Sequence, residues 1–252
     1  GPQEALFIHD AATTKGGDIL LTGSIKKSAP QYSNPFLAKI SSNGKLAWFY
    51  EIPGRNNDNG WAIATNETGD IYITGDMVTG LAPDFTDDGI NDLKTTKGTE
   101  VFVAAYRDNG ADIRFKWATN YPAKYSEVHG ISTDNSGNVV ISGSFQTEMT
   151  IGQQSHLIEG QSGAFLISLK DRDTTSSLNW GYTFGGLKKG ERAFGSGVTT
   201  DDENNVYYSG YFEKAIDLGP ISDSVQLEFN APDIQGFLAK YTPDGNPVWA
   251  HH

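Results

Sequence analysis

The sequence predicts an all-β protein built from four similar units. Four segments share one pattern, in which a turn is followed by strand-forming residues, a small hydroxyl residue and a glycine. They are residues 17–23, 69–75, 137–143 and 204–210, which read G-D-I-L-L-T-G, G-D-I-Y-I-T-G, G-N-V-V-I-S-G and N-N-V-Y-Y-S-G. A pattern repeated at this spacing indicates a repeat architecture. No helical i, i+3, i+4, i+7 pattern runs long enough to predict a substantial helix.

A second pattern follows each of these segments after a loop of variable length. It is an apolar run that begins with phenylalanine, at residues 36–40, 102–106, 165–169 and 237–241. Three of the runs lead into Asn-Gly or Asp-Gly pairs, which supply the positive φ angles of tight hairpins. One tryptophan then follows in every copy, at Trp48, Trp117, Trp180 and Trp249.

Each copy therefore resolves into four strands. In the second copy we expect them at about residues 61–66, 69–77, 99–107 and 112–120. Four antiparallel strands repeated around an axis form the blade of a β-propeller. We predict one β-propeller domain over residues 1–252, with blades at approximately 9–52, 61–120, 129–184 and 196–250. The recurrent Phe and Trp positions are interpreted as packing between blades.

Three ring arrangements are compatible with four blades in this chain. Four blades can close on themselves, the chain can be a section of a larger propeller, or two chains can complete one ring. An open arc would leave two apolar sheet faces in water. The closed four-bladed ring is the interpretation that we favour.

The composition excludes several kinds of chemistry. The 252 residues carry a net charge of −12, which disfavours polyanionic partners such as nucleic acid and anionic membranes. There is no cysteine, so thiolate catalysis, disulfides and zinc–thiolate sites are absent. No stretch approaches the roughly 20 apolar residues of a membrane span, and we expect no membrane insertion.

Three segments resemble the SBBP (β-propeller) repeat of secreted and cell-surface bacterial proteins. They are G-N-V-V-I-S-G-S-F at 137–145, A-I-D-L-G-P at 215–220 and G-F-L-A-K-Y-T-P-D-G-N-P-V-W-A at 236–250. The resemblance covers nearly the whole chain, and the third copy departs where residues 170–177 form a longer polar loop. It implies a propeller and an extracytoplasmic location, and it carries no catalytic signature.

The first candidate site is an acidic loop after the second strand of the second copy. Clustered carboxylate and amide oxygens around a Gly turn could hold calcium, which prefers oxygen ligands. The spacing does not match an EF-hand loop, so a solvated acidic loop is the favoured interpretation. The candidate calcium ligands are Asp84, Asp87, Asp88, Asn91 and Asp92.

The second candidate is a set of equivalent positions just before the innermost strand of each copy. Aligning the copies places His9, Trp61, His129 and Ser196 together, where a propeller would have one mouth of its channel. Two histidines could bind a metal, but a metal site normally needs a third protein ligand. Ordinary channel-rim residues are the favoured interpretation, and a ligand or peptide contacting Trp61 is the better functional one.

A third candidate is a set of aromatic residues near Asn-rich loops, namely Tyr32, Trp61, Tyr121 and Tyr125. Aromatic rings beside amides and carboxylates are typical of carbohydrate sites, and they are also common on β-rich surfaces. Nucleophilic catalysis finds no support, because there is no G-x-S-x-G elbow and no cysteine.

These observations predict a non-enzymatic, extracytoplasmic interaction module of a secreted, cell-surface or outer-membrane-associated bacterial protein. It would bind a protein partner through variable loops at one face of the propeller, including Trp61, His9, His129, Ser196 and Tyr125. The alternative is a carbohydrate-binding or polysaccharide-processing propeller. A purely structural role as a spacer is a third hypothesis. No cofactor is expected beyond calcium at the acidic loop.

Overall fold

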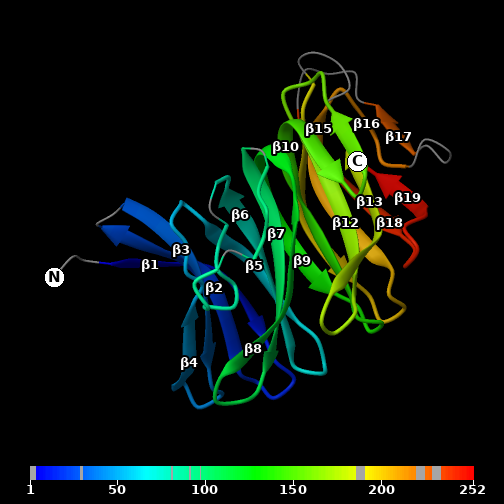
Figure 1. Cartoon of the computed structure of the whole chain (residues 1–252). Helices are drawn as coiled ribbons and strands as arrows, with labels where there is room; N and C mark the ends of the chain where they lie inside the picture. Colours follow the sequence, from blue (N-terminus) through cyan, green and yellow to red (C-terminus); the bar gives the residue numbers. More distant parts are fainter. Residues whose placement is uncertain are drawn as a thin grey trace. The chain divides into compact units, whose positions relative to one another are not determined.

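The chain consists of antiparallel β-sheets (Figure 1). The computed structural model describes residues 4–28, 31–80, 82–90, 92–96, 98–185, 191–219, 225–228 and 234–252. These residues form 19 strands and no helix, so the all-β prediction is confirmed. It follows that none of them forms a helix able to cross a membrane. Contacts divide the chain into two compact units, Gly1–Pro122 with Arg172–Ser176, and Ala123–Asp171 with Ser177–His252.

The first unit contains two four-stranded sheets. The first sheet has the order β1 (Ala5–Thr13), β2 (Ile19–Ser28), β3 (Gln31–Ile40) and β4 (Leu46–Glu51). The second sheet has the order β5 (Asn59–Thr65), β6 (Asp70–Val78), β7 (Thr99–Asp108) and β8 (Ile113–Tyr121). Every neighbouring pair is antiparallel and consecutive in sequence.

The second unit repeats this plan and adds short strands. Its third sheet consists of β9 (Ala123–Thr133), β10 (Asn138–Ile151), β12 (Gly163–Asp171) and β13 (Ser176–Phe184), with β11 (Gln154–Leu157) on the end of β10. Its fourth sheet consists of β14 (Ala193–Thr200), β15 (Val206–Glu213), β18 (Ile234–Tyr241) and β19 (Pro247–His251). A separate two-stranded sheet pairs β16 (Ala215–Asp217) with β17 (Gln226–Glu228) in antiparallel orientation. The added strands lie in the variable connections between second and third strands.

The turn at the start of each repeated segment has the same geometry in all four sheets. One residue has a positive φ angle, between 66° and 85°, which glycine and asparagine tolerate best. Three of these residues are glycines and the fourth is asparagine, which explains the change from G-D-I or G-N-V to N-N-V. The residues are Gly17, Gly69, Gly137 and Asn204.

The glycine that ends each repeated segment lies beneath a phenylalanine ring. In the second sheet Gly75 pairs with Phe102 in the register of β6 and β7. A Cβ atom at Gly75 would lie 2.8 Å from Phe102 Cε1 and would collide with the carbonyl oxygen of Asn59. The hydroxyl of Thr74 donates a hydrogen bond of 2.7 Å to the Phe102 carbonyl. We call this arrangement the Gly–Phe pair.

The Gly–Phe pair recurs in every sheet. The pairs are Gly23–Phe36, Gly75–Phe102, Gly143–Phe165 and Gly210–Phe237. In each case the space beside the glycine is filled by the ring and by a carbonyl oxygen of the first strand. The repeated pattern is therefore a steric requirement of the sheet, as its four-fold recurrence suggested.

Within the first unit the two sheets pack face to face. Leu20, Leu37 and Trp48 of the first sheet share one buried cluster with Ile71 and Ile73 of the second. The Trp48 indole also donates a 3.3 Å hydrogen bond to Asp108, in the β7–β8 hairpin. This tryptophan therefore packs between two sheets, as predicted.

The second unit repeats this packing, with one departure from the prediction. Trp180 of the third sheet is buried, and its indole donates a 2.9 Å hydrogen bond to the Pro243 carbonyl in the β18–β19 hairpin. Trp249 of the fourth sheet is only half-buried. Within the second unit, Trp249 is not part of the buried cluster that contains Trp180, so the predicted core role is not seen there.

The third copy also differs from its predicted form. The expected long polar loop at residues 170–177 is a tight turn at residues 172–175, closed by a 2.8 Å hydrogen bond from Arg172 N to the Thr175 carbonyl. The strands β12 and β13 continue to either side of this turn. Asp173 adopts a positive φ of 68° in place of the glycine used by the other copies.

Candidate functional site

A β-bulge interrupts the first strand of every sheet at the same position. The pairing of β1 with β2 passes from Ile8 to Asp10 and skips His9. The same shift skips one residue in β5, β9 and β14. The four skipped residues are His9, Trp61, His129 and Ser196, which the sequence alignment placed at equivalent positions. We call them the bulge residues.

The bulge explains why the residue type differs between the copies at this position, whereas the neighbouring glycine and phenylalanine are the same in every copy. An extra residue in one strand leaves the regular pairing and re-aims its side chain. The same bulge brings the carbonyl two residues earlier over the glycine of the Gly–Phe pair. The sheet thus constrains the glycine and the phenylalanine, and it leaves the bulge residue free to differ.

In the first unit the two bulge residues contact each other. The His9 and Trp61 rings stack with centroids 4.1 Å apart and planes 18° apart. His9 Nδ1 lies 2.8 Å from the Gly60 carbonyl oxygen, and the Trp61 indole donates a hydrogen bond to Asp76. Trp61 remains 38% exposed. The result is a fixed aromatic surface with a carboxylate at its edge.

In the second unit the bulge residues are more polar. His129 Nε2 lies 3.5 Å from Ser144 Oγ and 3.7 Å from a carboxylate oxygen of Glu127. Burial lowers the pKa of His129, and Glu127 offsets part of that effect. Ser196 is exposed. Ser144 directly follows Gly143, just as Asp76 directly follows Gly75. The contact of His129 with Ser144 is therefore equivalent to the contact of Trp61 with Asp76.

Tyr125 lies in β9, four positions before the bulge. Its side chain is 58% exposed and its φ angle is 54°, which is uncommon for an aromatic residue. The Lys124 ammonium lies 5.9 Å from the Tyr125 ring centroid. Of the other aromatic candidates for a sugar site, Tyr121 is buried and therefore offers no stacking surface.

The acidic loop after β6 uses its carboxylates to hold its own backbone. Asp84 accepts hydrogen bonds from the backbone N–H groups of Asp88 and Gly89, at 3.2 and 2.6 Å. Asp92 accepts from Phe85 and Thr86, at 2.6 and 3.1 Å.

Calcium binding at this loop remains a prediction. Among the described residues, no three His, Asp or Glu side chains are grouped closely enough to hold a metal ion. Asp87 has a positive φ of 57°, and Asn91 lies outside the described residues.

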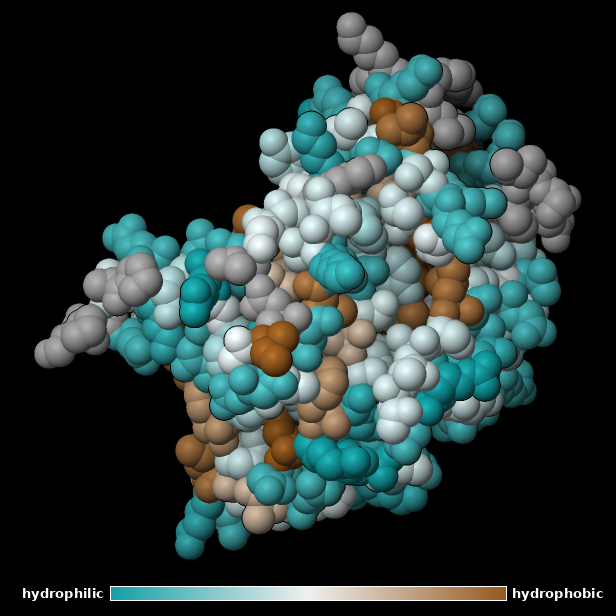
Figure 2. All heavy atoms as spheres, viewed as in Figure 1, coloured by the Kyte–Doolittle hydropathy of each residue, from teal (hydrophilic) through white to brown (hydrophobic). Residues whose placement is uncertain are grey.

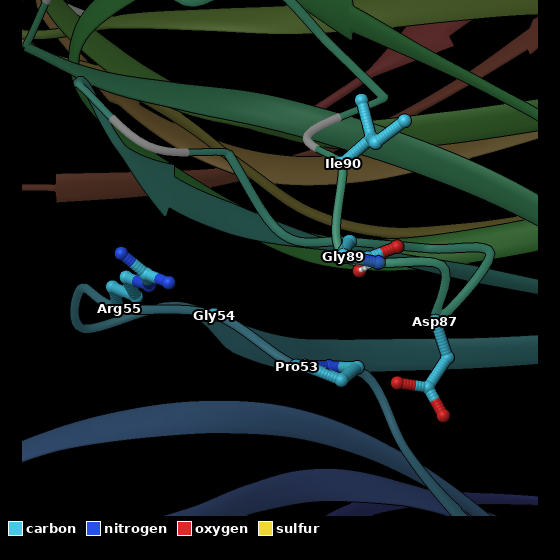
Figure 3. Close-up of a pocket in the computed structure, with 7 residues that line it drawn as sticks. Pro53, Gly54, Arg55, Asp87, Gly89 and Ile90 are labelled. Carbon is cyan, nitrogen blue, oxygen red and sulfur yellow. Dashed lines mark hydrogen bonds between the residues drawn. The ribbon is translucent and has the colours of Figure 1, made fainter.

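The acidic loop forms one wall of a cleft of about 490 Å³. Figure 3 shows Pro53, Gly54 and Arg55 of the β4–β5 connection on one side, and residues of the acidic loop on the other. The floor of the loop is fixed, because Phe85 is buried and its carbonyl accepts hydrogen bonds from Tyr50 and Tyr106 at 3.1 Å. The cleft pairs a guanidinium group with carboxylates, which suits a polar, peptide-like segment.

Two buried oxygens lie behind this cleft, at Gly54. A Cβ on Gly54 would lie 2.8 Å from Asp58 Oδ2 and 3.2 Å from Asn34 Oδ1. Both oxygens are buried and neither accepts a hydrogen bond. Burial raises the pKa of Asp58 to about 7, against the effect of a hydrogen bond from Val78 N–H. Asp58 therefore holds a proton at mildly acidic pH.

The sequence did not reveal Arg55, Asp76 or the Asn34–Asp58 pair as site residues. Arg55 comes to the cleft through a connection without a motif. Asn34 of β3 and Asp58 of the β4–β5 connection come near the same glycine, Gly54, only in the folded chain. The one local signal was the run of asparagines at residues 56–59. This run indicated a polar connection between strands, but it did not indicate which side chains the connection would bring together.

No protein-family model matches the chain. A search of curated proteins finds similarity to an uncharacterized WD repeat-containing protein of Acanthamoeba polyphaga mimivirus, which is 23% identical over 197 residues. The aligned region covers 69% of this chain and 14% of the length of that relative. The chain is thus similar to a small part of a much longer repeat protein.

Proposed function

We propose that the chain is a propeller-type, non-enzymatic scaffold that binds a protein partner through its bulge residues and the loops beside them. The observation that carries the proposal is the bulge common to all four sheets. It presents three kinds of side chain, namely histidine, tryptophan and serine, from four equivalent positions, whereas the turn and the Gly–Phe pair are nearly constant. Variable residues on a constant repeat frame are the usual binding surface of repeat proteins.

The propeller arrangement is supported by two further observations. Each sheet has four antiparallel main strands that pair in chain order, which is the form of a propeller blade, and sheets pack face to face within each unit. The similar mimiviral protein is described as WD repeat-containing, and WD repeats form propeller blades. In this proposal each sheet is one blade, and its first strand lies nearest the axis.

The cellular setting is proposed from the sequence. The segments at residues 137–145 and 236–250 resemble SBBP repeats, which occur in secreted and cell-surface bacterial proteins. The absence of cysteine and the net charge of −12 are compatible with an exported protein. We place the scaffold outside the cytoplasm, bound to another protein of the envelope or the cell surface.

Photo-crosslinking tests the proposed binding surface. A photoreactive amino acid replaces Trp61 in one variant and Leu157 in a control, because Leu157 is 73% exposed and lies on β11, not on a first strand that carries a bulge. We expect a defined protein adduct from position 61 in cells of the source organism, and none from position 157. The proposal is overturned if position 61 gives no adduct, or the same adducts as position 157.

A carbohydrate ligand is the second candidate, favoured by one observation. The exposed Trp61 ring, held by His9 and by Asp76, combines an aromatic face with a carboxylate, as sugar sites do. A glycan array with the wild-type chain and Trp61→Ala distinguishes the two functions. Binding that Trp61→Ala abolishes supports a sugar ligand, and release of reducing sugar would make the chain an enzyme.

A further inference from the structure

The carboxyl group of Asp58 is buried in the first unit without a positive charge beside it. Hydrophilic side chains cover most of the face drawn in Figure 2, where water stabilises an ionised carboxylate. Asp58 is different, because it is 0% exposed and its Oδ2 atom accepts no hydrogen bond. Its Oδ1 atom accepts one hydrogen bond of 2.9 Å, from Val78 N–H. A carboxylate buried with so few partners is unstable, so this site favours the protonated carboxyl group.

The charged groups on the neighbouring strands do not compensate an ionised Asp58. Burial raises the pKa of Asp58 to about 7, and the negative charge of Asp76 on β6 acts in the same direction. On β3, the Asn34 amide donates a hydrogen bond to Glu51 at the end of β4. Lys27 lies 2.9 Å from a carboxylate oxygen of Glu51 and so neutralises that residue. None of these strands therefore offers a cation to Asp58.

Asp58 ends the β4–β5 connection, residues 52–58, and its side chain ties this connection to β6. The N–H groups of Ile52 and Asp58 donate hydrogen bonds of 2.9 Å to carbonyl groups of β3, so both ends of the connection are fixed there. At the end of β6, Val78 donates to the Asp58 carboxyl group and accepts a 3.3 Å hydrogen bond from the Asn56 amide. The state of the Asp58 carboxyl group therefore affects how firmly the connection is held.

Gly54 links this buried carboxyl group to the cleft beside the acidic loop. Figure 3 shows Gly54 between Pro53 and Arg55 in one wall of the cleft. Arg55 is exposed, and Pro53 is bonded to the acidic loop through a 2.7 Å hydrogen bond from Asp84 N–H. A Cβ at Gly54 would lie 2.8 Å from Asp58 Oδ2, so the glycine packs directly on the unpartnered oxygen. A movement of Gly54 would therefore both hydrate the carboxyl group and change the width of the cleft.

We propose that a proton on Asp58 gates this cleft. With the proton bound, the connection stays packed on β3 and on the end of β6, and the wall of the cleft is closed. When the proton is lost, the buried charge favours hydration, and residues 53–57 move outward with Gly54. A ligand that contacts the closed wall is therefore released as the pH rises.

The direction of the pH effect follows from the two states of the wall. The pKa of Asp58 is about 7 in the closed wall and returns to its ordinary value near 4 when the wall is open and hydrated. Because the closed state holds the proton more tightly, protonation stabilises it. The open fraction should grow by about tenfold per pH unit between pH 4 and pH 7, and it should level off above pH 7.

Amide hydrogen exchange measured by NMR at pH 5 and pH 8 tests the gate. The exchange rates of Ile52 and Asp58 are followed, because their N–H groups bond to β3. Each rate is divided by the rate in the urea-unfolded chain at the same pH, which removes the intrinsic pH dependence. We expect the protection of both amides to fall by about a hundredfold from pH 5 to pH 8. Both should exchange faster than Val103, a buried residue of β7, which reports on global unfolding.

Three variants assign the effect to one carboxyl group. Asp58→Asn has no proton to lose, so its protection should be the same at both pH values. Asp87→Asn is the matched control, because it removes an exposed carboxylate from the opposite wall of the cleft. His9→Gln removes the one histidine of the first unit. Both controls should keep the hundredfold change of the wild type.

The proposal is overturned if the wild type has the same protection at both pH values, or if Asp58→Asn retains the change. It is equally overturned if Ile52 and Asp58 exchange no faster than Val103 at pH 8, because the carboxyl group would then be hydrated only by global unfolding. If Asp58→Asn does not fold, an NMR titration of the Asp58 carboxyl carbon in the wild type decides. Titration near pH 7 supports the gate, and titration near pH 4 contradicts it.

Discussion

Phe102 stands against the Cα atom of Gly75, its partner across β6 and β7, and leaves no room for a side chain. The ring and the Asn59 carbonyl oxygen occupy the two sides of the space that a Cβ would need. This relationship links the repeated sequence to the bulge, because the bulge at Trp61 positions the Asn59 carbonyl. The glycine, the phenylalanine and the bulge are therefore parts of one packing arrangement, and each requires the other two.

Replacing this glycine should destabilise the chain strongly. We expect Gly75→Ala to lower the free energy of unfolding by about 3 kcal/mol or more, since backbone must move to admit the methyl group. Gly16→Ala is the matched control, because its nearest neighbour would be 3.8 Å away and its φ is ordinary. Urea unfolding of both variants gives the comparison. Equal stability of the two would show that the Gly–Phe pair has no steric role.

The turns and the strand order could be predicted from the sequence because they depend on local chemistry. Positive φ angles at Gly17, Gly69 and Gly137 and the hairpin glycines follow from residue type. The bulges were not predicted as bulges, but the constant distance from the turn aligned their residues correctly. Such features are encoded within one repeat.

Features that depend on a neighbouring sheet could not be predicted in this way. Leu37 and Leu238 occur in the same F-L-A-K sequence, yet one is buried and the other is 44% exposed. Leu37 packs on the second sheet of its unit, whereas Leu238 belongs to the last sheet of the second unit. Arg55 and Asp58 likewise gain their surroundings only through contact between a connection and distant strands.

Asp58 should make stability depend on pH. Its folded pKa of about 7 lies above its unfolded value near 4, so the folded state keeps a proton that the unfolded state loses. This stabilisation is complete below pH 4 and is lost as the pH rises to 7. Asp58→Asn mimics the protonated form, because the asparagine side chain is also uncharged and of the same size.

We expect Asp58→Asn to stabilise the chain at pH 8 by about 1–3 kcal/mol, and to have little effect at pH 4. Unfolding in urea at the two pH values measures this. A variant that is less stable than wild type at pH 8 would mean that the Asp58 carboxylate is satisfied in the folded chain.

Asp70 should show the opposite pH dependence. Burial by itself would raise the pKa of Asp70, but hydrogen bonds from Arg107 and Lys116 lower it below its usual value. Lys116 Nζ lies 2.9 Å from Asp70 Oδ2, and both side chains are nearly inaccessible. Because the folded pKa is depressed, this contribution is present above pH 4 and is lost as the pH falls further.

We expect Asp70→Asn to cost about 3 kcal/mol at pH 7, because it removes the carboxylate that lies 2.9 Å from the buried Lys116 ammonium. Asparagine is native at the equivalent turn positions Asn138 and Asn205, so the turn itself should persist. Glu67→Gln is the control, since its exposed pair with Lys15 should contribute less than about 1 kcal/mol. Equal losses in the two variants would contradict a stabilising role for the buried pair.

The proposed propeller is tested most directly by distances between spin labels on equivalent strands. The chain has no cysteine, so labels attach only at introduced positions. One doubly labelled variant carries cysteines at His9 and His129, on first strands, and another at Ala47 and Leu178, on fourth strands. Labelled protein is diluted with unlabelled protein, so that only distances within one chain are measured. The account predicts narrow distributions and a shorter distance for the 9–129 pair, since first strands lie nearest the axis. Broad distributions, or a 9–129 distance that equals or exceeds the 47–178 distance, would contradict it.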